Sequence, residues 1–141
     1  MKVERIDHVA ILVNDTRKAQ EFFADLFGTK FNVLGDIKEM DIKSVLDPLG
    51  IELVEPLLPD GVTAKALKER GEGLTLLSLK VTDLDEAMTE MKARNIRLIQ
   101  HAKLRHCRVA VYHPNDLFGV MIELIAYEQE HPTAIAITQE R

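Results

Sequence analysis

Ile51-Glu52-Leu53 recurs as Ile122-Glu123-Leu124, 71 residues further along the chain. A second pair of similar segments, Val13-Asn14-Asp15 and Val81-Thr82-Asp83, is separated by 68 residues. Because the two matches have nearly the same spacing, the sequence predicts one module that is present twice. A repeated half that cannot close its own core has to pair with its copy, so we expect equivalent residues of the two halves to face a shared cleft.

The composition limits the class of protein. The chain has 141 residues, of which 46% are hydrophobic and 29% charged, as in a globular single domain. No apolar run approaches the roughly 20 residues that span a bilayer, and the first residues lack the apolar core of a secretion signal. The net charge of −5 argues against a nucleic-acid partner. We therefore expect a cytoplasmic protein that binds neither membranes nor nucleic acid.

The first half of the chain, residues 5–57, has the pattern of a β-α-β-β-β module. A β-prone run over residues 7–13 predicts a strand, and Asn14-Asp15 supplies side chains that can cap a following helix. Apolar residues at three- and four-residue spacing predict that helix over residues 16–27, with a glycine directly after it. Two or three further strands are expected between residues 31 and 57.

The second half, residues 74–126, repeats this plan after a linker of a turn and a short helix over residues 58–73. Residues 127–141 form an extra tail, whose apolar segment Ala134–Ile137 could cover a neighbouring subunit or fray. The predicted fold class is α+β, with residues 1–141 as a single domain in which two tandem βαβββ modules form a curled mixed sheet around one cleft. The expected elements of the second half are a strand at 74–81, a helix at 84–94, and strands at 96–99, 108–112 and 119–125.

Several segments together resemble the vicinal oxygen chelate superfamily, which includes glyoxalase I, bleomycin-resistance proteins and extradiol dioxygenases. Within it, the sequence looks most like the methylmalonyl-CoA epimerases. The resemblance extends over about residues 5–126, and it is the order and spacing of the segments that make it specific. These segments are IDHVAILVND at 6–15, IELVEPL at 51–57, AKALKERGEGL at 64–74, and YHP at 112–114 followed by GVMIEL at 119–124.

The resemblance implies a divalent metal ion held by one residue from each of four strands. The matching positions in this chain are His8, Glu52, Leu76 and Glu123. Similar epimerases and glyoxalases carry histidine where Leu76 stands, and an alkyl side chain cannot bind a metal. We therefore expect one ion of Co, Mn, Zn, Ni or Fe, held by His8, Glu52 and Glu123 alone. The resemblance also implies a homodimer.

The alternation of side chains along a strand leads to the same positions independently of the family. His8 shares a face with Ala10 and Leu12, while Glu52 and Glu123 each point away from the apolar residues beside them. Two carboxylates that converge in one cleft need a cation, a shared proton or a basic partner. One imidazole and two carboxylates suit a divalent transition metal with positions left open for substrate oxygens.

The predicted function is that of a metal-dependent isomerase or lyase resembling methylmalonyl-CoA epimerase or glyoxalase. It would act through a metal-stabilised enolate of a small acyl thioester, such as an acyl-CoA, or of a 2-oxo compound. Glu123 or Glu52 would move the proton as the catalytic residue, and Asp41 and Lys43 are weaker candidates. In the loop after residue 101, Lys103 and Arg105 would offer cations to an acidic substrate.

Two rival functions stay open. A metal-free protein that sequesters a small molecule, like the bleomycin-resistance members, is favoured by Leu76. Extradiol oxygenase chemistry usually needs two histidines and a carboxylate around iron, and ranks last.

His101, His106 and His113 could supply the nitrogen ligand that is missing at Leu76, although His113 precedes a proline and is expected in a turn. Cys107 is expected to be a packing residue, because no motif supplies a base for it.

Overall fold

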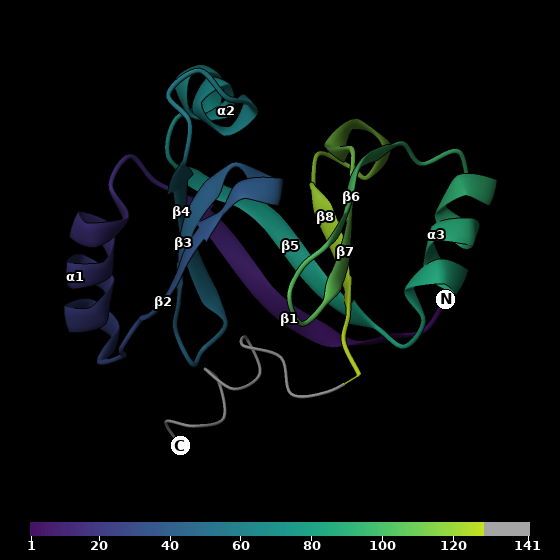
Figure 1. The fold of residues 1–141 in the computed structure, drawn as a ribbon, viewed down its shortest axis with the longest axis horizontal. Coiled ribbons are helices and arrows are strands. Elements are labelled where there is room, and N and C mark those ends of the chain that lie inside the picture. The colour runs from purple at the N-terminus through teal and green to yellow at the C-terminus, as the bar shows by residue number, and fades with distance from the viewer. Residues whose placement is uncertain (129–141) are drawn as a thin grey trace. The chain divides into compact units, whose positions relative to one another are not determined.

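The computed structural model describes residues 1–128 and divides them into two compact units (Figure 1). The first unit contains residues 1–9 together with residues 75–128, and the second unit contains residues 10–74. The start of the N-terminal strand is therefore grouped with the second half of the chain. The contact expected at Ala134–Ile137 lies outside the described residues. The single domain with its two sequence modules stays a prediction.

The second unit carries the helix and strands expected for the first half of the chain. Antiparallel pairing joins β2 to β3 and β3 to β4, and β4 is followed in the sheet by β1. Val13, Val45 and Leu53 form the core of this unit, and Phe23 of α1 packs against them. Its elements are the end of β1 (Val3–Leu12), α1 (Thr16–Phe27), β2 (Asn32–Ile37), the 3-10 turn η1 (Lys38–Met40), β3 (Ile42–Leu46), β4 (Ile51–Pro56) and α2 (Val62–Arg70).

In the first unit the strand order is β1-β5-β8-β7-β6. β5 runs parallel to β8, whereas the pairs β8–β7 and β7–β6 are antiparallel. Val81, Ala87 and Leu124 belong to the core that α3 covers. The predicted α+β class with a mixed sheet is therefore confirmed. Besides the start of β1, the elements are β5 (Gly73–Val81), α3 (Leu84–Ala93), β6 (Leu98–Lys103), β7 (Arg108–Tyr112), the 3-10 turn η2 (Pro114–Asp116) and β8 (Ile122–Ala126).

An aspartate caps the first turn of both α1 and α3. Asp15 Oδ1 accepts a hydrogen bond from the backbone N–H of Lys18 at 3.1 Å, and Asp83 Oδ1 accepts one from Glu86 at 2.9 Å. These bonds satisfy backbone donors that have no partner within the helix. The cap predicted from the sequence is confirmed, and it recurs at the equivalent position of the repeat. Among residues 1–128, no helix is long and apolar enough to cross a membrane.

The boundary of β6 differs from the expectation of a strand at residues 96–99. Asn95 adopts a φ of 58°, and Ile96 donates its N–H to a carbonyl of α3 at 3.0 Å, so the turn that ends the helix still includes residue 96. β6 begins at Leu98 and continues through the polar His101, which pairs with β7. Hydrogen bonding to the neighbouring strand, rather than apolar alternation, determines where this strand lies.

Replacement of Asp83 by alanine removes the cap of α3 and leaves a backbone N–H without its partner. We expect the free energy of unfolding, measured by urea titration, to fall by about 1 kcal/mol, and Asp15→Ala to have a similar effect. Lys92→Ala, an exposed change within α3, is the control and should stay within about 0.5 kcal/mol of the wild type. Unchanged stability in both aspartate variants would show that the caps contribute nothing.

Candidate functional site

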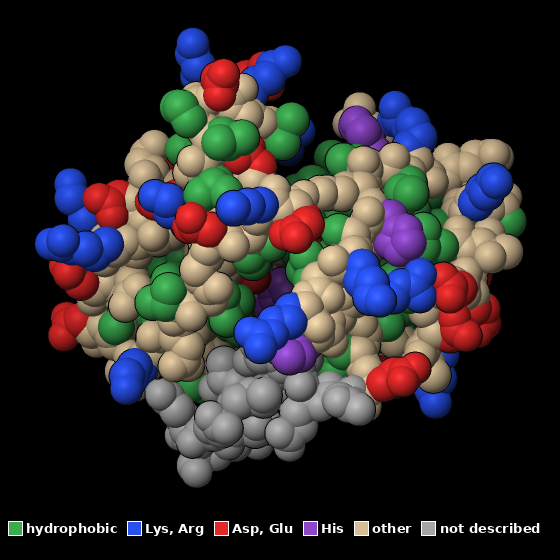
Figure 2. Space-filling model, viewed as in Figure 1, with side chains coloured by type: hydrophobic (Ala, Val, Ile, Leu, Met, Phe, Trp, Pro, Cys, Tyr) green, Lys and Arg blue, Asp and Glu red, His purple; other side chains and the backbone are tan. Residues whose placement is uncertain are grey.

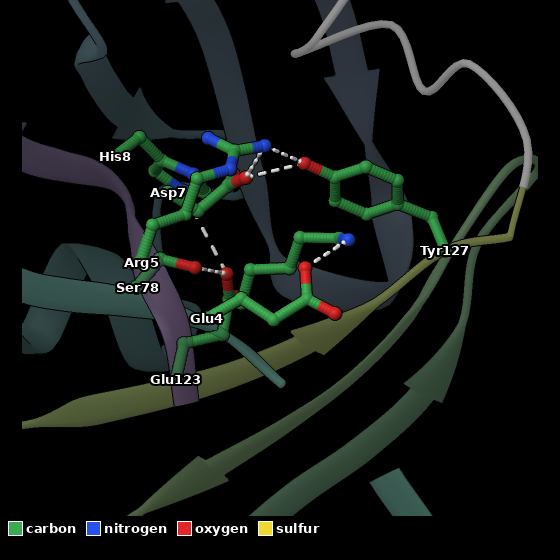
Figure 3. A network of polar contacts seen from close by, with 8 residues as sticks. Glu4, Arg5, Asp7, His8, Ser78, Glu123 and Tyr127 are labelled. Carbon is green, nitrogen blue, oxygen red and sulfur yellow. Dashed lines mark hydrogen bonds and ion pairs between the residues drawn. The ribbon is translucent and has the colours of Figure 1, made fainter. Parts of the chain in front are cut away.

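Ser78 and Glu123 lie opposite each other on the parallel strands β5 and β8. Leu79 and Leu124, the residues that follow them, pack in the direction of α3. Because successive side chains on a strand point to opposite faces, Ser78 and Glu123 leave the apolar layer together. The Ser78 hydroxyl donates a hydrogen bond to Glu123 Oε1 at 2.7 Å (Figure 3). Glu123 therefore points away from the apolar layer, as its place in the strand predicted, and Ser78 is its hydrogen-bond donor.

His8 of β1 contacts the same carboxylate. His8 Nε2 lies 3.6 Å from Glu123 Oε1, and His8 Nδ1 lies 2.8 Å from Asp7 Oδ2 (Figure 3). All three side chains are buried, and that of Asp7 has an exposed fraction of 0%. The structure thus brings together two of the three predicted ligands, His8 and Glu123, and adds a second carboxylate on the other side of the imidazole.

The two carboxyl groups beside His8 have opposite electrostatic environments. Burial raises the pKa of Glu123 above its ordinary value, although the charge of His8 and the hydrogen bond from Ser78 act in the other direction. Burial also acts to raise the pKa of Asp7, but hydrogen bonds from His8 and Tyr127 outweigh it and hold that pKa below its ordinary value. Asp7 is therefore the group that stays ionised, and Glu123 is the group that takes up a proton more readily.

Sequence reasoning missed Asp7, Ser78 and Tyr127. Asp7 precedes His8 directly, and Ser78 lies on the same face of β5 as Leu76, two residues before it, so both could have been found from their neighbours. The Tyr127 hydroxyl donates to Asp7 Oδ1 at 2.7 Å across 120 positions of sequence, and no local pattern indicates this contact. These three side chains surround the predicted pair with hydrogen-bonding groups.

Glu52 lies on β4 in the second unit, where it is 8% exposed and stands opposite Leu46 of β3. Its neighbour Leu53 belongs to the core that α1 covers, so Glu52 points to the other face of the strand. The orientation away from the apolar layer agrees with the sequence analysis. Whether Glu52 is a ligand or moves a proton stays a prediction.

Asp41 and Lys43, the weaker candidates for proton transfer, have structural contacts in the second unit. Asp41 Oδ1 accepts from the N–H of Leu58 at 3.0 Å, and Asp41 Oδ2 accepts from that of Thr63 at 3.3 Å. These bonds fix the turn that leads into α2. Lys43 Nζ lies 3.4 Å from the carboxylate of Glu55. Whether either side chain takes part in proton transfer stays a prediction.

Leu76 is an alkyl residue on β5, and two of the histidines that could replace it have contacts in the structure. His113 Nδ1 accepts a hydrogen bond from the N–H of Asn115 at 3.1 Å, which confirms its place in a turn. His101 Nε2 lies 3.3 Å from the guanidinium of Arg108. Within residues 1–128, no group of three or more His, Cys, Asp and Glu side chains is gathered as a metal site.

A separate hollow of about 720 Å³ lies against the end of α3 and the start of β6. Its titratable lining residues are Lys92, Arg97 and Tyr112. Arg97 Nε lies 2.9 Å from Asp116 Oδ2, and the hydrogen bonds from Arg97 lower the pKa of Asp116 to about 2. The hollow therefore lacks a carboxyl group and an imidazole among its described lining, and it is a weaker site for proton chemistry than His8 with Glu123.

Charged side chains of both signs are interspersed over the face of the molecule shown in Figure 2. Lys103 and Arg105, which the sequence analysis proposed for attraction of an acidic substrate, are both exposed at the end of β6 and just beyond it. They belong to the same unit as His8 and Glu123. Their exposure leaves them accessible to an anionic group in solution.

The sequence matches the Glyoxalase/Bleomycin resistance protein/Dioxygenase superfamily over residues 7–112. It is 31% identical over 130 residues to the mitochondrial methylmalonyl-CoA epimerase of Mus musculus, a match that covers 87% of this chain and 73% of the relative. The crystal structure of methylmalonyl-CoA epimerase from Mycobacterium tuberculosis is similar with a TM-score of 0.79 and 30% identity, covering 90% of each chain. The Streptomyces coelicolor methylmalonyl-CoA epimerase in complex with 2-nitronate-propionyl-CoA shares the fold, with a TM-score of 0.82 and 22% identity over 91% of this chain and 100% of that one.

Cys107 gives a test of the electrostatics around the site. Burial and the charges of Glu123 and Asp7 raise the pKa of its thiol from 9.0 to about 12. A thiol that stays protonated is a poor nucleophile, so Cys107 should resist labelling by a thiol-reactive disulfide at pH 8 and react fully in urea. Because its folded pKa is the higher one, the contribution of this group to stability is present below pH 9 and lost as the pH rises toward 12.

The control for that experiment is Lys92→Cys, which places a second thiol on the exposed surface of α3. The added thiol should react at once in the folded protein, while Cys107 does not. Rapid labelling of Cys107 at pH 8 without denaturant would show that the carboxylates of the site are open to solvent.

Proposed function

Since the chain belongs to the Glyoxalase/Bleomycin resistance protein/Dioxygenase superfamily, we propose that it is an isomerase that moves the proton next to the carbonyl of a small acyl thioester or 2-oxo compound. The observation that carries this proposal is the buried pair of His8 Nε2 and Glu123 Oε1, 3.6 Å apart and hydrogen-bonded on both sides. Such a pair suits a reaction in which a weak carbon acid gives up a proton and takes one back.

The relatives support this class of reaction. Two methylmalonyl-CoA epimerases share 30% and 31% identity with the chain over most of its length, and both are enzymes that act as isomerases. The expectation of an enzyme is thereby confirmed. Their substrate is an acyl-CoA, and we propose the same chemical class for this chain, because Lys103 and Arg105 are exposed cations of the unit that carries the pair. The homodimer and the cytoplasmic location stay predictions.

The chemistry assigns the proton to Glu123. The carbon–hydrogen bond next to the carbonyl breaks, its electron pair moves to the carbonyl oxygen to form an enolate, and the proton goes to the carboxylate. Burial raises the pKa of Glu123, which brings it closer to the pKa needed of a group that both accepts and returns a proton near neutral pH. Return of a proton to the opposite face of the carbon completes an epimerisation and needs a second donor. From the sequence, Glu52 is the alternative to Glu123 for moving the proton.

A divalent metal ion fits the His8 side of this site. Two ligands that each bind one ion at about 2.1 Å lie roughly 3 to 3.5 Å apart, which is close to the separation of His8 Nε2 and Glu123 Oε1. A histidine ligand usually donates its other N–H to a carboxylate, and His8 Nδ1 lies 2.8 Å from Asp7 Oδ2. We propose His8 and Glu123 as ligands, with Glu52 as the predicted third, and a ligating glutamate would detach from the ion before it takes the proton. When bound, the ion would polarise the substrate carbonyl and favour the charge that develops on its oxygen.

Leu76 is the observation that favours a second function, the metal-free binding of a small molecule. The family resemblance implies a histidine ligand at this position, and a site with fewer donors would hold an ion less tightly. A protein that only binds its ligand has no need for an ionisable Glu123. The role of this carboxylate therefore distinguishes the two functions.

Exchange of the substrate proton with solvent tests the proposal. Methylmalonyl-CoA incubated with the protein and a divalent metal in D₂O should gain deuterium at the carbon between its two carbonyl groups, as measured by mass spectrometry against a sample without protein. Glu123→Gln should slow this exchange by at least about 100-fold while the circular dichroism spectrum stays unchanged, because an amide cannot take the proton.

Glu69→Gln makes the same chemical change on the exposed surface of α2 and should leave the exchange rate as in the wild type. Full activity in Glu123→Gln would refute the assignment of this residue. If no acyl thioester or 2-oxo acid exchanges its proton even with the wild type, the binding function replaces the enzymatic one.

A further inference from the structure

Asp7 is held on both of its carboxylate oxygens. Asp7 Oδ2 lies 2.8 Å from His8 Nδ1, whereas Asp7 Oδ1 accepts from the Tyr127 hydroxyl at 2.7 Å and lies 3.2 Å from the guanidinium of Arg5. Arg5 also donates to the Tyr127 hydroxyl, so Arg5, Asp7 and Tyr127 form a closed ring of contacts (Figure 3). The carboxylate cannot turn away from His8 without breaking bonds to two other side chains.

The ring of Tyr127 is itself fixed in place. Lys80 Nζ lies 4.9 Å from the centroid of the tyrosine ring, in the position of a cation–π contact. Lys80 is in turn paired with Glu4 of β1 at 2.5 Å. Tyr127 follows directly after β8, the strand that carries Glu123. Contacts from β1 and β5, together with its place directly after β8, therefore determine where the tyrosine hydroxyl points.

The consequence of these contacts concerns the hydrogen on the His8 ring. The Tyr127 hydroxyl donates to Asp7 and the guanidinium of Arg5 faces it, so Asp7 serves these contacts as a carboxylate. A carboxylate can only accept hydrogen bonds, so His8 Nδ1 has to be the nitrogen that carries the hydrogen toward Asp7. In the neutral ring this leaves a lone pair on Nε2, the nitrogen that faces Glu123. The orientation of Asp7 thus decides which tautomer of His8 is present, and only one tautomer can bind a metal ion or accept a proton at Nε2.

We propose that Tyr127, with Arg5, is a positioning residue that acts through Asp7 to hold His8 in the tautomer with hydrogen on Nδ1. The proposal rests on the function proposed above, since the tautomer matters for the reaction only if His8 Nε2 acts in the site. Tyr127 and Arg5 have no contact with the reacting atoms in this scheme. They affect only whether His8 Nε2 has a free lone pair.

The test is Tyr127→Phe, which removes the hydroxyl and keeps the ring against Lys80. The measurement is a ¹⁵N nuclear magnetic resonance spectrum of histidine side chains in the metal-free protein, with the His8 signals identified by their loss in His8→Gln. In the wild type, His8 should be in the Nδ1–H form. In Tyr127→Phe, the Nε2–H form should appear beside it, and the affinity for Co²⁺ should fall by about 10-fold to 100-fold, as is usual when a supporting hydrogen bond to a ligand is lost.

Tyr112→Phe is the matched control, because Tyr112 is a buried tyrosine of the same unit whose hydroxyl is not in contact with Asp7 or His8 in the described structure. It should leave the tautomer of His8 unchanged. Asp7→Asn provides a second variant that keeps the size of the side chain. Its amide can donate to Nδ1, so it should shift His8 toward the Nε2–H form further than Tyr127→Phe does.

An unchanged His8 tautomer and an unchanged Co²⁺ affinity in Tyr127→Phe would overturn the proposal, even if the variant were less stable to heat. The tautomer is read without substrate, so it is independent of the enzymatic assay. Absence of proton exchange in the wild type would refute the proposed function, while a shifted tautomer in Tyr127→Phe would still support the positioning role.

Discussion

The hydrogen bond between His8 Nδ1 and the buried carboxylate of Asp7 is the interaction on which the candidate site depends. A charged group without exposure to solvent is costly unless it is paired and hydrogen-bonded, and Asp7 has such bonds from His8 and Tyr127 together with the charge of Arg5. The ionised carboxylate then sets the role of each imidazole nitrogen. The other nitrogen of the same ring, His8 Nε2, faces Glu123.

The burial of Glu123 follows from the pairing of its strand. Parallel pairing of β5 with β8 places Glu123 beside Ser78, while Leu79 and Leu124 turn to the side that α3 covers. The carboxyl group is thereby removed from water but keeps one hydrogen bond and one imidazole neighbour. Because of its burial, a carboxyl group in this position holds a proton more readily than a surface glutamate does. That difference is what the proposed isomerase reaction uses.

Much of this arrangement could be predicted from the sequence because alternation along a strand is a local property. The repeated Ile-Glu-Leu predicted which way Glu52 and Glu123 point relative to the helices, and the aspartate at the end of the first strand predicted a helix cap. The residue type at position 76 also showed, without any structure, that one expected metal donor is missing. These features need no knowledge of contacts between distant segments.

The Asp7–His8 contact, the role of Tyr127 and the start of β6 could not be predicted. They depend on contacts between segments distant in sequence or on departures from ideal strand geometry. Neighbouring residues on an ideal strand point to opposite faces, yet the side chains of Asp7 and His8 meet. Tyr127 belongs to the segment that the sequence analysis places in the tail, although its hydroxyl reaches Asp7. The start of β6 depends on a left-handed residue at Asn95 that no alternation of apolar residues reveals.

Metal content is the most direct test of the central claim that His8 and Glu123 are ligands of one ion. Chelator-washed protein is reconstituted with a divalent metal, freed of excess ion and analysed by mass spectrometry. We predict about one ion per chain in the wild type and in Glu69→Ala, a change of an exposed carboxylate on α2, and loss of that ion in His8→Ala and in Glu123→Ala. Absence of a stoichiometric ion in the wild type, or its retention in both ligand variants, would contradict the account.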